Sequence, residues 1–183
     1  PIPPTVSKKP IPKICWWFTV ITGELFFAGI RPDAKGAVVL ISGSGNLLSV
    51  ADLPTSGGRQ GDDLINPALL YQTLHKFPVT TYFIVEERSP RLKGPEPFGT
   101  GRSLGVVEGV LAAIGFEYDR VSAPSWQRSH RLYGAAADFR RTRALELDPE
   151  LAPHLTTKDT LPRADAYLMA RYGLSAAQSE DEL

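Results

Sequence analysis

The chain has 183 residues, of which 43% are hydrophobic, so it can fold as one domain around a core of its own. Lysine plus arginine and aspartate plus glutamate both number 20, and this zero net charge by itself gives no indication of nucleic-acid binding. The single cysteine excludes an internal disulfide and, with only three histidines, argues against a structural zinc site. The apolar run near Trp16 is soon interrupted by Glu24, so we expect no membrane span.

The first half of the chain predicts an arm followed by strands. Residues 1–15 are rich in proline and lysine, and we expect them to form a flexible arm. Three β-type runs separated by turns then predict a meander: Phe26–Arg31, Ala37–Ser42 and Leu47–Leu53. Asn66 is a suitable N-cap for a helix that ends near Lys76, and a fourth strand follows at Thr80–Glu86.

The second half alternates helices with strands. Its predicted elements are a loop at Ser89–Phe98, a helix at Gly101–Ile114, a strand at Phe116–Val121, a short helix at Pro124–Leu132, a helix capped by Asp138 that ends near Leu147, and a last helix from Thr160 to Gly173. Residues 175–183 are polar and acidic, and we expect a disordered tail. We therefore expect residues 16–174 to form one α/β domain, with a mixed five-stranded sheet flanked by helices.

A row of glycines distinguishes the helix at Gly101–Ile114. Gly101, Gly105 and Gly109 recur every four residues and therefore share one helix face. Each glycine costs a helix about 1 kcal/mol relative to alanine, so the row indicates close approach by another backbone. A dimer partner, DNA and ordinary packing of the helix on the sheet are all open explanations.

Basic residues concentrate between Arg88 and Arg143, where ten lysines and arginines accompany five acids and give a net charge of +5. This stretch predicts either a basic DNA-facing surface or a solvated face of mixed charge. The candidate phosphate contacts are Arg88, Arg91, Lys93, Arg102, Arg128, Arg131, Arg140 and Arg141. In the loop Ser89–Phe98, Phe98 is a candidate wedge that stacks on bases, unless the loop is an ordinary disordered one.

Acidic residues stand at the ends of predicted elements. Glu86 ends the fourth strand, Asp159 precedes the last helix, and Asp165 lies in its first turns. Clustered carboxylates repel one another unless a cation neutralises them, and a pair of Mg²⁺ or Mn²⁺ ions is held in this way by phosphodiesterases. Taken singly, Glu86 has an alternative partner in Arg88, and the two aspartates have an alternative role as charges that stabilise a helix start.

Six segments in the same order resemble RuvC-type Holliday junction resolvases. Ala28–Ala37 is similar to their opening motif G-I-D-P-x-x-x-G-A, and Asp33 points to the plant and algal chloroplast branch. The other segments are Asp52–Thr55 (D-M-P-T), Ile84–Glu86 (V-I-E), Gly99–Gly105 (the glycine-rich helix start), Pro124–Arg128 (P-x-x-W-K) and Lys158–Ala170 (K-K-D-x-G-R-A-E/D-A-L-L-I-A). Together they cover the chain from about residue 26 to residue 173.

The resemblance implies an RNase H-like fold, a homodimer, a four-way DNA junction as substrate, paired nicking that depends on two Mg²⁺ or Mn²⁺ ions, and a chloroplast location. It implies metal-binding catalytic roles for Glu86 and Asp165. The same role is carried over less directly to Asp159, because its spacing to Asp165 is one residue longer than usual and Pro162 stands near the place of a glycine.

Arg31 stands where the family has its first catalytic aspartate. An arginine is always protonated, so it removes a metal ligand and places a cation among the remaining carboxylates. We expect metal affinity and cleavage to be largely lost, and Asp33 is not expected to compensate because it follows Pro32 in a turn. A deliberately inactivated variant and a natural junction binder are both open explanations, and the otherwise complete set of motifs favours the first.

Three functions follow from these observations. The first is a Holliday junction resolvase that is disabled by Arg31. The alternative is a non-catalytic protein that binds branched DNA. A third function is another RNase H-like nuclease acting on RNA–DNA hybrids, which the P-x-x-W segment and the glycine row make less favourable.

Overall fold

The computed structural model describes residues 24–57, 64–87 and 96–181. The predicted arm at 1–15 lies outside these residues, as do Arg88, Arg91, Lys93 and most of the predicted loop that contains them. No helix within the described ranges is both long enough and apolar enough to span a membrane.

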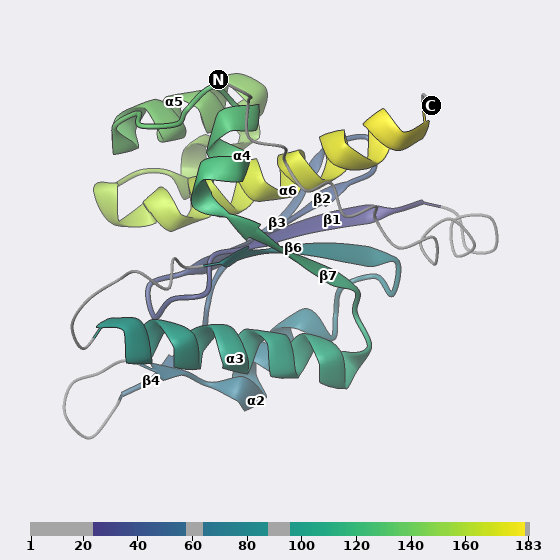
Figure 1. Ribbon diagram of the computed structural model, residues 1–183, viewed down its shortest axis with the longest axis vertical. Coiled ribbons are helices and arrows are strands. Elements are labelled where there is room, and N and C mark those ends of the chain that lie inside the picture. Colours follow the sequence, from purple (N-terminus) through teal and green to yellow (C-terminus); the bar gives the residue numbers. More distant parts are fainter. Residues whose placement is uncertain (1–23, 58–63, 88–95, 182–183) are drawn as a thin grey trace, which may run out of the picture.

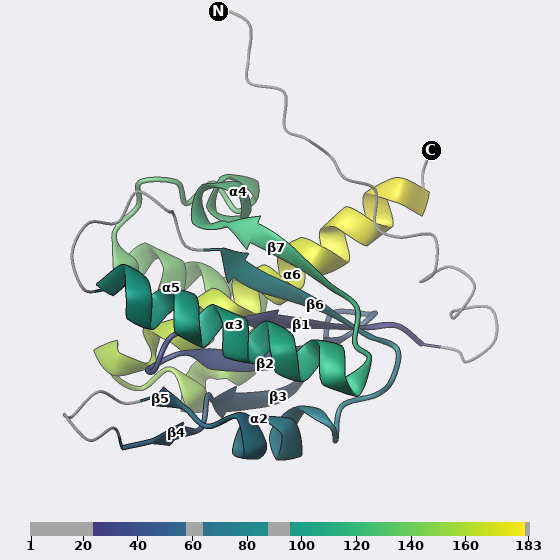
Figure 2. The same ribbon diagram turned by 60° about the horizontal axis from the view of Figure 1, so that its bottom comes forward.

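A mixed five-stranded sheet forms the centre of the molecule, with strand order β3-β2-β1-β6-β7. Its strands are β1 (Phe26–Ile30), β2 (Ala37–Ser42), β3 (Leu47–Asp52), β6 (Thr81–Glu87) and β7 (Tyr118–Ser122). β1, β2 and β3 are antiparallel, as the meander predicts, whereas β6 is parallel to β1 and β7 is parallel to β6. Two short strands that were not predicted, β4 (Thr55–Ser56) and β5 (Leu64–Ile65), pair near α2 (Figure 2).

Helices cover both faces of the sheet (Figure 1). On one side lie α2 (Pro67–Leu74) and α3 (Glu96–Ile114), and on the other lie α4 (Ala123–Ser129), α5 (Ala137–Leu147) and α6 (Leu161–Asp181). Two 3₁₀ turns, η1 (Pro149–His154) and η2 (Lys158–Thr160), connect α5 to α6. The predicted α/β class, with a mixed five-stranded sheet flanked by helices, is confirmed.

Alternating side chains of the central strands build two cores. Along β6, Tyr82 and Ile84 belong to the core under α6, whereas Phe83 and Val85 belong to the core under α2 and α3. Side chains of a strand alternate between faces, so a strand covered on both faces is apolar throughout. The polar exception is Glu86, which is buried at the carboxyl end of this run.

Gly29 lets α6 pack directly against β1. A Cβ atom at this position would overlap the carbonyl oxygen of Ala166 and would lie 2.8 Å from the backbone nitrogen of Ala170. Only glycine permits so close an approach of a helix backbone to a strand. Because Ala166 follows Asp165 in the chain, this packing brings the Asp165 backbone close to the end of β1.

Several predicted helix boundaries are wrong. The last helix does not end at Gly173 but continues to Asp181, so it includes most of the predicted tail. Gly173 is buried where α6 crosses the sheet, and a Cβ there would lie 2.7 Å from Ile84, so packing and not capping requires the glycine. Asp138 lies in the first turn of α5, whose N-cap is Ala136. By contrast, Asn66 caps α2 as predicted, since its side chain accepts hydrogen bonds from two backbone amides.

The helix α3 begins at Glu96, so the last residues of the predicted loop Ser89–Phe98 are helical. Its glycine row is exposed: apart from chain neighbours and the adjacent backbone of α3 itself, no atom of the described chain lies within 4 Å of a Cβ built on Gly101, Gly105 or Gly109. Val107 and Leu111 instead pack toward the sheet. Packing of α3 on its own sheet therefore does not explain the row.

Candidate active site

Three elements bring Arg31, Glu86 and Asp165 together. Ile30 at the end of β1 pairs with Val85 of the parallel strand β6, so the next residues, Arg31 and Glu86, emerge side by side. Asp165 enters from the second turn of α6, which Gly29 allows to lie close to β1. The predicted proximity of these three positions is therefore present in the structure.

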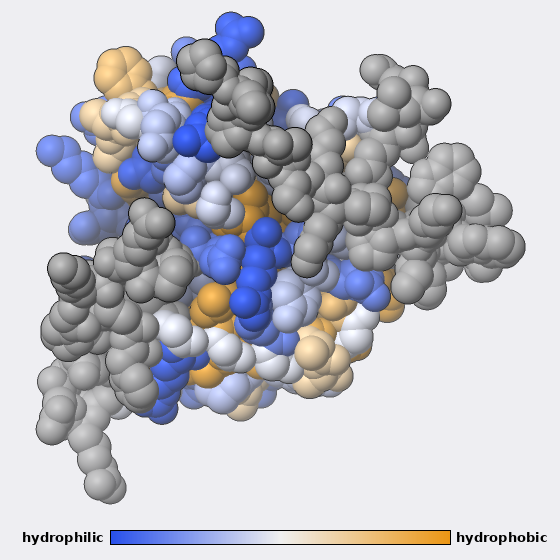
Figure 3. All heavy atoms as spheres, viewed as in Figure 1, coloured by the Kyte–Doolittle hydropathy of each residue, from blue (hydrophilic) through white to orange (hydrophobic). Residues whose placement is uncertain are grey.

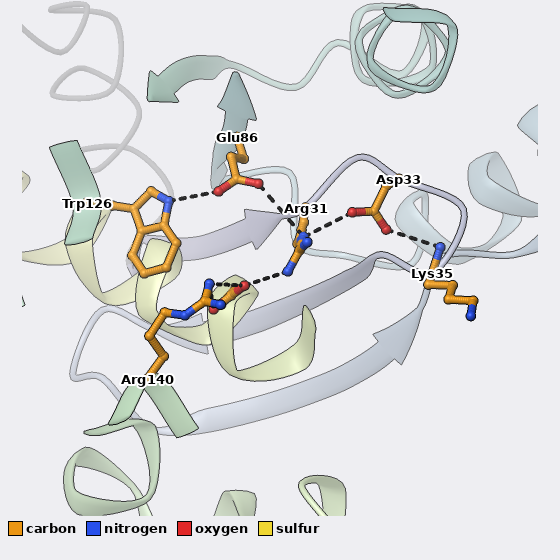
Figure 4. A network of polar contacts seen from close by, with 7 residues as sticks. Arg31, Asp33, Lys35, Glu86, Trp126 and Arg140 are labelled. Carbon is orange, nitrogen blue, oxygen red and sulfur yellow. Dashed lines mark hydrogen bonds and ion pairs between the residues drawn. The ribbon is translucent and has the colours of Figure 1, made fainter. Parts of the chain in front are cut away.

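The guanidinium of Arg31 lies in the centre of this group and meets three carboxylates (Figure 4). Its Nη1 atom donates to Oδ2 of Asp165 at 2.6 Å, and its Nε atom donates to Oδ2 of Asp33 at 3.0 Å. The same Nε atom is 3.9 Å from Oε2 of Glu86, an ion-pair distance. Asp33 also accepts a hydrogen bond from the backbone amide of Lys35 at 3.1 Å, which fixes the turn after β1.

A second arginine holds the buried aspartate. Nη1 of Arg140, on α5, donates to both carboxylate oxygens of Asp165, at 2.9 and 2.8 Å. The Asp165 side chain is only 1% exposed, so the two guanidinium groups take the place of water around its charge. Arg140 was predicted as a phosphate contact, and its bond to Asp165 was not anticipated.

Glu86 is held by a buried tryptophan. Nε1 of Trp126, on α4, donates to Oε1 of Glu86 at 3.1 Å (Figure 4). Trp126 is completely buried, and a buried indole N–H usually requires an acceptor. That requirement was the one sequence signal for this contact, since the prediction placed Trp126 in the core without assigning its polar atom a partner.

Burial and the two arginines have opposite effects on the pKa of Asp165. Burial raises the pKa of its carboxyl to about 6, although Arg140 and Arg31 both act to lower it. Burial also lowers the pKa of Arg31, but Asp165, Asp33 and Glu86 outweigh this effect and raise it above its ordinary value. Arg31 is therefore a permanent cation in this site.

The residues present do not fit divalent metal ions. Across residues 24–57, 64–87 and 96–181, no three histidine, cysteine, aspartate or glutamate side chains are arranged to hold one. The oxygens of Asp165 and Glu86 that would serve as ligands instead face the Arg31 guanidinium. Asp159 lies exposed on η2, and in the described part of the chain no hydrogen bond or ion pair joins it to this group.

The predicted DNA contacts have different environments. Arg102, Arg128 and Arg131 are exposed, whereas Arg141 is half-buried and Arg140 is committed to Asp165. Phe98 lies in the first turn of α3, and its side chain is outside the description. Of the predicted contacts on this side of the sheet, Arg128 on α4 and Arg131 just after it are exposed, while Arg88, Arg91 and Lys93 lie outside the described residues.

Comparison with known proteins identifies the fold. No protein-family model and no curated protein sequence matches the chain. The structure is similar to that of Thermus thermophilus RuvC, with a TM-score of 0.59 and 20% identity over 85% of this chain and 97% of that one. It is also similar to T. thermophilus RuvC in complex with Holliday junction substrate, with a TM-score of 0.58 and 17% identity over 84% of this chain and 96% of that one. The chain therefore has the RNase H-like fold of RuvC, with an arginine among the carboxylates of the candidate active site.

Proposed function

We propose that this chain recognises four-way DNA junctions on a resolvase scaffold, and that Arg31 prevents it from cleaving them. The proposal is supported by the likeness to RuvC, one structure of which contains a Holliday junction substrate. It is also supported by the position of Glu86 and Asp165 at adjoining element ends, where the resemblance in sequence places catalytic acids.

The contact between Arg31 and Asp165, at 2.6 Å, is the observation that carries the loss of cleavage. Asp33, Glu86 and Asp165 contribute three negative charges, and Arg31 and Arg140 contribute two positive ones. With an aspartate at position 31, four carboxylates would face one arginine among the residues that the structure describes, an excess of charge suited to divalent cations. The arginine removes that excess and also occupies the oxygens, so metal would have to displace it.

Other parts of the proposal concern the assembly. The exposed glycine row of α3 offers a surface that a second copy of the chain can approach closely, which supports a homodimer. Arg102, Arg128 and Arg131 are exposed and available to DNA phosphates. The chloroplast location stays a prediction from the resemblance.

The test compares the present chain, which carries Arg31 and is termed wild type only as the reference for substitutions, with Arg31→Asp. In binding assays with Ca²⁺, wild type should prefer a four-way junction over a linear duplex of the same sequence. With Mg²⁺ or Mn²⁺ it should leave the junction uncut. Arg31→Asp should nick paired strands of the junction under the same conditions.

The matched control is Arg31→Asp combined with Glu86→Gln, which should bind the junction but not nick it. Equal binding of junction and duplex by wild type would overturn junction recognition. Nicking by wild type itself would overturn the role assigned to Arg31. A folded Arg31→Asp chain that binds junctions and never cuts would favour the alternative, a branched-DNA binding protein without a latent nuclease site.

A further inference from the structure

A single segment, residues 126–140, is bound at both ends to the carboxylates of the candidate active site. At its start, Trp126 donates to Glu86, and at its end Arg140 donates to Asp165. The segment includes most of α4 and the beginning of α5, on the α6 side of the sheet (Figure 1). Both ends of this segment therefore lie at the site, and Phe139 is the chain neighbour of Arg140.

The middle of the 126–140 segment is also fixed to the body of the protein. Nε2 of His130 lies 2.7 Å from the carbonyl oxygen of Leu168, on α6, and Leu132 is buried in the core. Burial lowers the pKa of His130, which is consistent with a neutral ring donating to that carbonyl. Side chains that project from this segment are thus mounted on a support that is already ordered, which reduces the entropy cost of binding.

Two aromatic side chains on this support face solvent. Tyr133 is 60% exposed and Phe139 is 65% exposed, and neither belongs to the cores on the two faces of the sheet. The guanidinium of Arg128 lies 4.4 Å from the centre of the Tyr133 ring, a cation–π arrangement. Figure 3 shows exposed apolar atoms bordered by hydrophilic ones at the upper left, in the region of α5.

The charge around these rings selects the kind of partner. The 126–140 segment contains three arginines and one acid, Asp138, a net charge of +2. Arg140 is paired with Asp165, whereas Arg128 and Arg131 are exposed. Aromatic residues and arginine are both enriched at protein–protein interfaces, so the rings alone do not select the partner. Exposed arginines beside exposed rings on a surface of net positive charge match the polyanionic backbone and the bases of unpaired nucleotides. Arginines hold the phosphates, and the rings stack on the bases.

We propose that Tyr133 and Phe139 stack on unpaired bases of branched DNA beside the candidate active site. The inference rests on the proposed function and adds a basis for its selectivity. Bases in a linear duplex are stacked on their neighbours and expose little of their faces, whereas bases at the crossover of a junction can be unstacked. Contacts with these two rings therefore favour the junction over the duplex.

The experiment measures binding of the full chain to a four-way junction carrying 2-aminopurine at the crossover, to the matched duplex and to one single strand. Tyr133→Ala and Phe139→Ala should each weaken junction binding by roughly 10-fold and leave duplex binding unchanged. They should also reduce the change in 2-aminopurine fluorescence. Tyr133→Phe, which keeps the ring, should behave as wild type. So should Tyr71→Ala, which removes an exposed ring from α2 on the opposite face.

The outcomes separate this inference from the proposed function. Selective junction binding by wild type that both alanine variants retain in full overturns the stacking role and leaves junction recognition in place. A wild-type chain without junction preference, whose binding to the single strand depends on Tyr133 and Phe139, overturns the proposed function and supports the stacking surface. No binding to any of the three DNA probes overturns both.

Discussion

The Nη1 atom of Arg31 lies 2.6 Å from Oδ2 of Asp165, and this ion pair joins the end of β1 to the second turn of α6. Asp165 is buried, so an unpaired charge there would be strongly destabilising. Arg31 and Arg140 together supply the positive charge that balances the Asp165 carboxylate, a role that the resemblance assigns to metal ions. The site is thus stabilised by the protein alone, and this has consequences for metal, pH and stability.

The first consequence is that the stability of the wild-type chain should not depend on divalent metal. A metal ion raises the free energy of unfolding only if it binds the folded chain. Arg31 occupies the carboxylate oxygens of Asp165 and Glu86 that would bind the metal. Thermal unfolding with millimolar Mn²⁺ should therefore show no rise in Tm for wild type and a clear rise for Arg31→Asp. Adding Glu86→Gln to Arg31→Asp should diminish that rise. An equal rise in wild type would show that metal binds despite the arginine.

Removing the arginine without supplying a ligand should destabilise the chain. Arg31→Met removes one of the two arginine partners of Asp165 and also the ion pair with Glu86, and we expect a loss of about 3 kcal/mol in the free energy of unfolding. Urea denaturation measures this loss. Arg143→Met is the control, because its ion pair with Glu146 is solvent-exposed and should contribute less than about 1 kcal/mol. Equal losses in the two variants would contradict a special role for Arg31.

Asp165 should make stability depend on pH. Burial raises its folded-state pKa to about 6, whereas an unfolded aspartate titrates near pH ~4. Between these values the folded chain retains a proton that the unfolded chain has lost, so this group makes stability fall as pH rises. Below about pH 4 and above about pH 6 its contribution is constant.

Asp165→Asn isolates this effect because asparagine does not titrate. The free energy of unfolding of wild type minus that of the variant should decrease by about 3 kcal/mol from pH 4 to pH 6.5. Chemical denaturation across this range measures the difference. A difference that stays constant, or that increases with pH, would show that the two arginines hold Asp165 ionised in the folded chain.

Register and resemblance made the centre of the site predictable. Glu86 follows an apolar strand, so its place at a strand end could be derived from the sequence, and the parallel pairing of β1 with β6 then puts Arg31 beside it. Arg140 could not be assigned to Asp165, because 25 positions separate them and the path of the chain through α5 decides which of several arginines meets the buried acid.

Helix ends were less predictable than strands, since local signals compete with packing. Gly173 resembles a helix stop in the sequence, yet the apolar residues beyond it, Leu174 and Ala177, pack on the core and extend α6. Asp138 is a residue type that is common at helix N-caps, but it lies inside the first turn of α5. Tertiary contacts override the local preference at Gly173, whereas Asp138 in the first turn still favours the helix dipole.

The hydrogen bond from Trp126 to Glu86 should contribute measurably to stability. Trp126→Phe retains most of the buried ring but removes the N–H group that donates to the Glu86 carboxylate. A hydrogen bond to a charged partner contributes about 1.5 to 3 kcal/mol. Combining it with Glu86→Met, which has no acceptor oxygen, in a double-mutant cycle separates this bond from the loss of ring volume. A coupling energy near zero would mean that the indole serves only to fill the core.

Two glycines should respond oppositely to the same substitution. Gly29→Ala forces a methyl group against the backbone of α6 at Ala166, so it should push the helix away from β1 and cost several kcal/mol. Gly105→Ala adds a methyl group in open space on α3 and should stabilise the monomer by up to about 1 kcal/mol. Denaturation at low protein concentration measures both effects.

If the exposed glycine row is where a second copy docks, Gly105→Ala should at the same time weaken self-association in sedimentation experiments. A variant that is more stable and associates as wild type would exclude this face of α3 from the dimer interface.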